Sequence, residues 1–207
     1  MPSASRWIVA VAMLVIAFFG AAEPALSGFV GLPNMLGAAM KRISLGNFTL
    51  PPVAFTQFCL HYPDQCKSER IAFRGGPVRL TETRWDDLRD VNKAVNASIV
   101  PEANAEGVPG EKWLIRPASG DCNDFAVTKR YELLKRGWPP RALLLSEVVT
   151  TWGEHHLVLV VRTSLGDLVL DNLTAQIRPW ARSPYRWVRI QTSKNPNYWA
   201  SLGNSKV

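Results

Sequence analysis

Beyond its N-terminus, the chain lacks any apolar run long enough to cross a bilayer, and it contains no internal repeat or low-complexity segment. At the N-terminus, Arg6 precedes an almost unbroken apolar run over residues 7–19, which the small residues 20–22 follow. This order is typical of a secretory signal peptide, and the run is shorter than the roughly 20 residues of a retained membrane anchor. We therefore predict a signal peptide and cleavage region over residues 1–27. Residues 28–207 are predicted to form a single domain, periplasmic or secreted, without a membrane span after cleavage.

The chain also lacks clusters of one charge, although it is basic overall. Lysine and arginine number 24 against 17 aspartate and glutamate residues, for a formal net charge of +7. These basic residues are dispersed along the sequence, whereas nucleic-acid-binding chains concentrate them in runs or stripes. Because an exported chain would not meet chromosomal DNA, nucleic acid is excluded as a partner. The charge instead indicates a solvated surface with affinity for anionic polymers of the cell envelope.

Cysteine is scarce, with three residues in the whole chain. Cys59 and Cys66 are close in sequence, and Pro63 and Asp64 between them favour a turn. In an oxidising compartment this pair predicts a disulfide that closes a small loop, rather than two separate buried thiols. A zinc site is disfavoured because no second pair of ligands follows at a useful spacing. The pairing leaves Cys122 as an unpaired thiol, which in an exported chain suggests a nucleophile.

Two segments have the spacing of amphipathic helices. Apolar residues recur every three or four positions over 83–98, and 100–110 is predicted to be a loop because it holds prolines and glycines. The second helix begins after Asp121, a good N-cap residue, and ends at Gly137. Cys122 would then lie in the first helical turn, at the positive end of the helix dipole. That position is expected to lower the pKa of the thiol from its ordinary value of about 8.5.

After this helix the sequence changes to short β-branched and aliphatic runs. We predict strands over residues 142–150, 155–163, 167–171 and 185–190, the last of them as the final strand, and an extended lead without periodicity over 28–52. The tight turn 164–166 makes the second and third of these strands a hairpin. Helices followed by consecutive antiparallel strands indicate an α+β fold.

Residues on these elements have the types that thiol chemistry requires. A cysteine nucleophile needs a base to accept its proton and a third group to orient that base. The hairpin brings His155 and His156, at the start of one strand, beside Asp171 at the end of the next. Strand alternation places the two histidines on opposite faces, so only one can face the helix of Cys122. Each residue alone has a structural interpretation, as a small buried thiol, a solvated histidine or a turn aspartate, but their order favours catalysis.

Five blocks of the sequence lie in order between Phe58 and Trp199. They read GDCNDFA (120–126), GWP (137–139), HLVLVVR (156–162), GDLVLDNL (166–173) and YRWV (185–188). Together they resemble the bacterial transglutaminase-like cysteine proteinase family. The resemblance implies a papain-like, transglutaminase-type core, in which a cysteine at a helix N-terminus packs on an antiparallel sheet that carries histidine and aspartate. It also implies a catalytic triad of Cys122, His156 and Asp171, because the family's histidine directly precedes the apolar strand.

One residue departs from the pattern that this resemblance implies. The well-understood members are periplasmic proteases that release large adhesins from the cell surface by cutting near paired alanines. In them, an acidic residue after the cysteine helps to bind calcium. Here Asp121 before the cysteine is kept, but Asn123 follows it. Since calcium prefers charged oxygen ligands, we predict weakened calcium binding and no required cofactor, and do not transfer the adhesin substrate.

The predicted function is an exported cysteine peptidase. His156 would take the proton of Cys122, Asp171 would fix the imidazole, and the thiolate would attack a peptide bond of an envelope or surface protein to form a thioester acyl-enzyme. The N–H of Cys122 and one further donor would stabilise the oxyanion. Trp113 is a candidate for that donor, although a core position is its simpler interpretation.

Two alternatives use the same residues differently. The acyl group could pass to an amine, as in a transglutaminase, or the chain could be an inactive protein that binds an envelope partner. Peptidoglycan peptides are a further substrate class within the enzymatic interpretation.

Overall fold

The computed structural model describes residues 41–68, 77–105 and 107–203, all of which belong to the unit that spans residues 31–207. The predicted signal peptide, residues 1–27, lies outside the described residues, as does the first part of the predicted extended lead. Among the described residues, no helix is long and apolar enough to cross a membrane. Because residues 1–40 are not described, the predicted boundary between signal peptide and domain at residues 27 and 28 stays a prediction.

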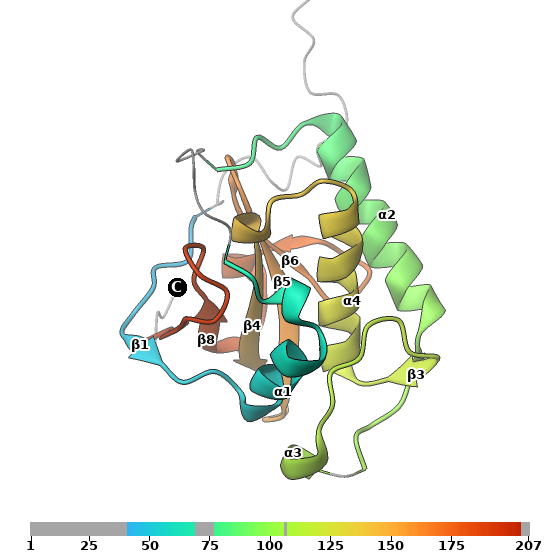
Figure 1. Cartoon of the computed structure of the whole chain (residues 1–207). Coiled ribbons are helices and arrows are strands. Elements are labelled where there is room, and N and C mark those ends of the chain that lie inside the picture. The colour runs from blue at the N-terminus through green and yellow to red at the C-terminus, as the bar shows by residue number, and fades with distance from the viewer. Residues whose placement is uncertain (1–40, 69–76, 106, 204–207) are drawn as a thin grey trace, which may run out of the picture. The chain divides into compact units, whose positions relative to one another are not determined.

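Seven antiparallel strands form the main sheet (Figure 1). From one edge to the other they are β1 (Phe48–Thr49), β9 (Trp199–Ser201), β8 (Arg186–Gln191), β4 (Leu143–Val149), β5 (His155–Thr163), β6 (Gly166–Leu170) and β7 (Arg178–Pro179). The central strands β4, β5 and β6 follow one another in the chain, and nearly all their side chains are buried. A separate parallel pair consists of β2 (Val100–Pro101) and β3 (Ser119–Gly120).

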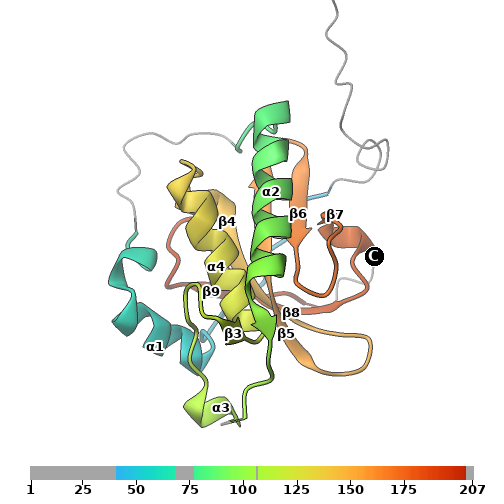
Figure 2. The ribbon, with the colours of Figure 1, turned by 90° about the vertical axis from the view of Figure 1, so that its right-hand side faces the viewer.

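The helices gather on one face of this sheet. They are α1 (Val53–His61), α2 (Glu82–Ser98), α3 (Gly107–Gly110) and α4 (Cys122–Lys135). Figure 2 shows α2 and α4 side by side, and α4 packs directly on β5. Gly137 ends α4 because its φ of 77° lies in the left-handed region, which glycine adopts without strain. The sequence after this glycine then returns to the sheet as β4.

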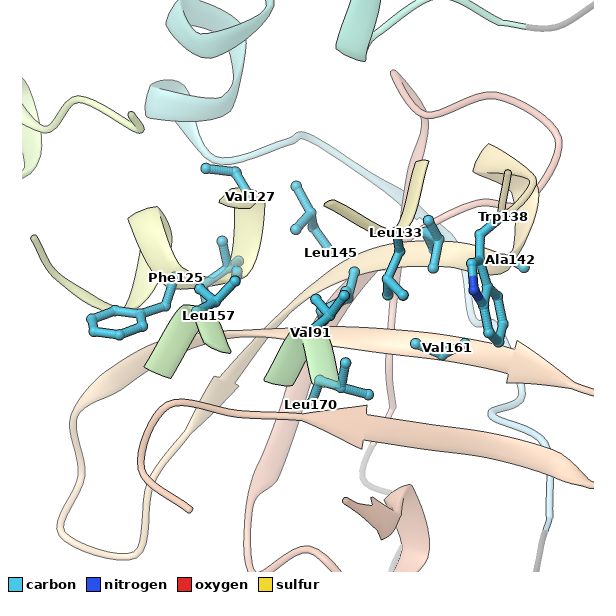
Figure 3. Close-up of a cluster of buried hydrophobic side chains, with 14 of the residues drawn as sticks. Val91, Phe125, Val127, Leu133, Trp138, Ala142, Leu145, Leu157, Val161 and Leu170 are labelled. Atoms are coloured by element: carbon cyan, nitrogen blue, oxygen red, sulfur yellow. The ribbon is translucent and has the colours of Figure 1, made fainter. Parts of the chain in front are cut away.

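Two hydrophobic cores lie on opposite faces of the sheet. Figure 3 shows the first, in which side chains of α2 and α4 meet those of β4, β5 and β6. Along β5, Leu157, Leu159 and Val161 enter this first core, whereas Val158 and Val160 enter the second. Because both faces of β5 are buried, its register is strongly specified.

The predicted elements that carry the candidate residues are present. The helix over 83–98 corresponds to α2, the helix after Asp121 to α4, and the three consecutive strands to β4, β5 and β6, so the predicted α+β class is confirmed. The loop prediction for 100–110 is wrong in part, because this segment contains β2 and α3. The strand over 185–190 is β8 but is not the final one, since β9 follows it. β1 pairs with β9 and β2 pairs with β3, so these two short strands depend on partners elsewhere in the chain rather than on local periodicity.

Helix α1 was not predicted because its sequence has almost no amphipathic period. Its buried positions are Ala54, Phe55 and Phe58, and the rings of both phenylalanines contact Trp113. The helix is therefore stabilised by tertiary packing, which a local pattern does not reveal.

The predicted disulfide between Cys59 and Cys66 is present, with a Cα–Cα distance of 5.6 Å. It joins the end of α1 to the turn that follows. Asn197, before β9, donates a hydrogen bond of 3.1 Å from Nδ2 to the carbonyl of Cys66. Cys122 is the free cysteine. The disulfide loop is thus attached to the sheet but leaves the third thiol available.

Replacement of both Cys59 and Cys66 by serine is expected to lower the free energy of unfolding by about 2 kcal/mol, because the unfolded chain regains the entropy of the closed loop. Urea denaturation measures this change, with Cys122→Ser as a control that keeps the disulfide and shifts the midpoint less. Thiol titration of the unreduced, unfolded protein should find a single reactive thiol. Three reactive thiols would contradict the pairing.

Candidate active site

Cys122 is the first residue of α4, and hydrogen bonds around it define the start of this helix. Asp121 is the N-cap, and its Oδ1 accepts the backbone N–H of Asn123 at 2.9 Å. In return, Asp124 Oδ2 accepts the N–H of Asp121 at 3.0 Å, which completes a capping box. A Cβ atom at Gly120 would lie 2.1 Å from Asp124 Oδ2, so this close approach requires glycine. Local contacts therefore place the cysteine at the helix start.

Cys122 is half-buried as a residue, and the surroundings of its thiol favour the neutral form. Burial is the main cause that raises the pKa of this thiol to about 12. A hydrogen bond from the backbone N–H of Leu157 acts in the opposite direction, while the carboxylates of Asp121, Glu111 and Asp171 add to the increase. The expectation that the helix terminus lowers the thiol pKa is therefore wrong, because desolvation and three carboxylates outweigh the helix dipole. The thiol needs a base to become a nucleophile.

The two histidines at the start of β5 have different surroundings. The side chain of His155 is 70% exposed, and its Nδ1 lies 2.5 Å from Glu147 Oε1. His156 is buried, and its Nε2 lies 2.8 Å from Asp171 Oδ1. This second contact connects β5 to the residue that follows β6. It makes His156 the candidate base, as the family resemblance implied.

Strand alternation alone would have selected the other histidine. Because side chains alternate along a strand, His155 is expected on the same face as Leu157, whose side chain enters the core beneath α4. His156 is expected on the same face as Val158, whose side chain enters the core on the opposite face. At this end of the strand, the face of β5 that packs on α4 therefore does not identify the candidate base.

The length of β6 explains how the thiol reaches this end of the strand. β6 ends at Leu170, which pairs with Leu159, so the first residues of β5 have no β6 partner. On the other side, β4 pairs with β5 as far as His155. The open edge is where the N–H of Leu157 hydrogen-bonds to the thiol of Cys122. The early end of β6 thus admits the N-terminus of α4 beside the backbone of the candidate base.

Asp171 is a buried carboxylate that is surrounded by donors. Its Oδ1 accepts the N–H of Leu173 at 3.0 Å as well as the contact from His156, and its Oδ2 accepts the hydroxyl of Tyr185. Asn96 of α2 donates to the backbone carbonyl of Asp171 at 2.9 Å. Burial alone would raise the pKa of Asp171, but the hydrogen bonds and the charge of His156 outweigh it and lower that pKa. Asp171 is therefore ionised.

An ionised Asp171 determines the tautomer of His156. A carboxylate can only accept hydrogen bonds, so Nε2 of His156 carries the proton that is directed at Oδ1. Nδ1 is then the ring nitrogen that can accept a proton. The arrangement supplies a buried, oriented imidazole in its basic tautomer, as proton abstraction requires.

Glu111 connects the loop before α4 to the helix start. Its Oε1 accepts Nε1–H of Trp113 at 2.7 Å and Nδ2–H of Asn123 at 2.5 Å. Burial is the main cause that raises the pKa of Glu111, and the charges of Asp121 and Glu147 contribute. Because Trp113 is buried among the rings of α1 and its N–H is already bonded, it belongs to the core and is not a free oxyanion donor.

Tyr185 is the residue that the sequence analysis did not assign to the site. It lies just before β8, and its ring centre is 5.7 Å from that of His156. Burial and the hydrogen bond to Asp171 raise the pKa of its hydroxyl, so the hydroxyl stays protonated and donates. The YRWV block was the available signal, but nothing in it relates the tyrosine to a carboxylate fourteen residues away.

Tyr185→Phe is expected to lower the free energy of unfolding at pH 7 by about 2 kcal/mol, because a buried carboxylate loses a donor. The pKa of Asp171 is lowered in the folded state, so this contribution is fully present above the ordinary aspartate pKa of about 3.9 and is lost as the pH falls through the lowered folded-state pKa. Urea denaturation at pH 7 and at about pH 2.5 should show a smaller difference at the lower pH. Tyr198→Phe, at an exposed ring, is the control. Equal effects of the two substitutions would contradict the assignment.

Three solved structures of LapG from Legionella pneumophila are similar to this chain. The first shares 26% identity, covers 59% of this chain and 70% of LapG, and has a TM-score of 0.47. A calcium-bound form shares 24% identity over 59% of this chain and 73% of LapG, with a TM-score of 0.50, and shows a shared fold. An EGTA-treated form shares 24% identity, with a TM-score of 0.48. No curated protein matches the chain.

The family model described as bacterial transglutaminase-like cysteine proteinase matches residues 45–207, which include α4, β5 and β6 in full. The match also includes every residue that contacts Asp171. A thiol at a helix start that is hydrogen-bonded to the residue after a buried, oriented histidine has the groups that such a peptidase requires. The chain therefore belongs to the bacterial transglutaminase-like cysteine proteinase family, and it is a transglutaminase-like cysteine peptidase with an α+β, papain-like core.

Proposed function

We propose that Cys122, His156 and Asp171 form the catalytic triad of an exported peptidase that hydrolyses a peptide bond in an envelope or surface protein. The observation that carries the proposal is the 2.8 Å contact between His156 Nε2 and Asp171 Oδ1, together with the hydrogen bond from Leu157 to the thiol. An inactive binding protein would not need a buried histidine held by a buried carboxylate, since burial of both groups costs free energy.

The first chemical step is proton transfer. Because the pKa of the Cys122 thiol is raised, the resting thiol is neutral, and Nδ1 of His156 accepts its proton as the sulfur attacks the substrate carbonyl. Asp171 stabilises the imidazolium that forms. The reaction thus depends on general-base catalysis rather than on a preformed thiolate.

The next steps complete hydrolysis. The carbonyl oxygen becomes an oxyanion, which the backbone N–H of Cys122 at the start of α4 would stabilise. The carbon–nitrogen bond breaks, the leaving amine takes the proton from His156, and a thioester remains on Cys122. Water then attacks the thioester, His156 accepts a proton from that water, and the thiol is released with the carboxylic acid product. An amine in place of water would give transglutaminase-type transfer.

The two adjacent histidines provide a matched test of this mechanism. Cys122→Ala should abolish release of a fragment from envelope or surface proteins, and His156→Ala should reduce the rate by about a thousandfold or more, since it removes the base. His155→Ala removes a mostly exposed ring on the same strand and should retain most of the activity. Mass spectrometry of material released from cells that carry each variant measures the outcome.

Three results would contradict the proposal or change it. Unchanged release with Cys122→Ala would exclude the nucleophile, and a greater loss with His155→Ala than with His156→Ala would exclude the base. Incorporation of a labelled amine, with no new protein terminus, would replace hydrolysis by acyl transfer.

Calcium fits poorly at the start of α4. One LapG structure is described as calcium-bound, and here Asp121, Asn123 and Glu111 would be the nearest oxygen ligands. However, Asn123 directs its Nδ2 donor at Glu111, and Asp121 uses Oδ1 as the helix cap. In the described ranges, no group of three or more His, Cys, Asp and Glu side chains could hold a metal. We infer that the amide of Asn123 links Glu111 to α4 directly, so that the peptidase works without calcium.

Chelation with EGTA is therefore expected to leave the cleavage rate and the melting temperature unchanged. Asn123→Glu would set a second carboxylate against Glu111 and lower the melting temperature, and added calcium should restore it. Asn123→Ala, which loses the hydrogen bond without adding charge, should be destabilised and show no calcium response. Loss of wild-type activity on chelation would contradict the inference.

A further inference from the structure

Lys129 is a lysine in the interior of the protein. It lies on α4 and is 1% exposed, with Nζ 5.9 Å from the centre of the Phe125 ring. Lysine is almost never fully buried, because removal of an ammonium group from water costs free energy that packing alone does not return. A methionine would fill a similar volume without this cost. The position therefore calls for an explanation beyond packing.

The geometry of α4 directs Lys129 toward the active site. Cys122 and Lys129 are seven residues apart, which is close to two helical turns, so they share one face of the helix. Helical side chains tilt toward the N-terminus, and the position of Nζ near Phe125, one turn earlier, shows that Lys129 follows this rule. The ammonium thus extends along α4 in the direction of Cys122.

Asp171 is the charged group that interacts with this ammonium. From α2, the neutral side chains of Asn92 and Asn96 face the segment after β6, where they donate to the carbonyls of Ala175 and Asp171. From β5, His156 contacts the same carboxylate, and on α4 the thiol of Cys122 is also affected by the charge of Asp171. The charged residues in the middle of α2 are exposed on its other side. Lys129 and Asp171 are therefore the two opposite charges buried at this site.

We propose that Lys129 is a positioning residue of the peptidase: its buried ammonium balances the charge of Asp171, so that the proton transfer from Cys122 to His156 takes place in a site without net charge. This inference rests on the proposed function of the triad. His156 can accept the proton only as a neutral imidazole, and the resting thiol is neutral, so the charges of Lys129 and Asp171 then sum to zero. Without the ammonium, the uncompensated carboxylate would oppose the negative charge that develops on the sulfur.

The pH dependence of this effect distinguishes it from a packing role. Burial lowers the pKa of Lys129 to about 7, and Asp171 opposes that shift. The ammonium is therefore present below about pH 7 and is lost above it. The benefit of Lys129 over a neutral side chain should be largest in mildly acidic solution and should disappear in alkaline solution, whereas a packing role would not change with pH.

The test compares Lys129→Met with Lys135→Met. Lys135 lies on the same helix, and its Nζ is 5.6 Å from the ring of Tyr131 four residues earlier, which repeats the relation of Lys129 to Phe125 at an exposed position. The readout is the rate at which iodoacetamide alkylates Cys122 in the folded, full-length protein between pH 5.5 and 9. Lys129→Met should react about tenfold more slowly at pH 6 and at nearly the wild-type rate at pH 9, while Lys135→Met should match the wild type throughout.

Melting curves show whether the variant is folded. A cooperative melting transition of Lys129→Met at both ends of the pH series is the condition for comparing alkylation rates. A rate ratio that is constant with pH would overturn the proposal and leave Lys129 as a structural residue.

A double substitution separates this inference from the proposed triad. If Lys129 acts through Asp171, Lys129→Met should have no pH-dependent effect on alkylation in an Asp171→Asn background. A full effect in that background would overturn the inference alone. If His156→Ala leaves the alkylation rate of otherwise wild-type protein unchanged, the proposed base is wrong, whatever Lys129→Met does.

Discussion

A carboxylate can be buried only where donors surround it, and this requirement at Asp171 connects several separate parts of the fold. His156 reaches the carboxylate from β5, Tyr185 from the segment before β8, and the N–H of Leu173 from the loop that follows β6. Asn96 attaches the same loop to α2. Since each donor comes from a different part of the chain, the folded arrangement and the ionised, oriented state of Asp171 depend on each other.

The start of α4 shows how a common generalisation fails in a particular environment. A helix N-terminus favours a thiolate, but here the first turn is capped by Asp121 and Asp124, and Glu111 is nearby. Burial of the thiol, together with nearby carboxylates, instead raises the pKa of Cys122. A neutral resting thiol also resists oxidation, because thiolate character governs the susceptibility of cysteine. Base catalysis by His156 would thus limit reactivity to the moment when substrate is bound.

Interior positions of this protein divide into those that stabilise the fold and those that cost stability. The leucine and valine side chains of β4, β5 and β6 bury apolar surface on both faces of the sheet. Lys129, Asp171 and His156 instead bury polar or charged groups that apolar residues could replace with a gain in stability. Such positions call for a functional explanation, because packing does not account for them.

Local contacts made several features predictable from the sequence. Gly120, Asp121 and Asp124 define the start of α4 within five residues, and Gly137 ends it, so the place of Cys122 at a helix N-terminus could be deduced. The turn at 164–166 determines the hairpin of β5 and β6, and the spacing of the cysteine pair determines the disulfide. In each case the interacting groups are close in the chain.

Long-range contacts decided which histidine joins Asp171, the direction in which the thiol pKa shifts, and the part played by Tyr185. Alternation of side chains along β5 would place His155, not His156, on the face that packs on α4. However, β6 ends at Leu170, which leaves an open edge of β5 where the N–H of Leu157 bonds to the thiol of Cys122. The thiol pKa depends on burial and on charges from separate segments, which a linear pattern does not contain. The sequence by itself determined the candidate nucleophile and the elements that carry the candidate residues. The tertiary structure decided its partners and its protonation, because burial and the register of distant strands exist only in the folded chain.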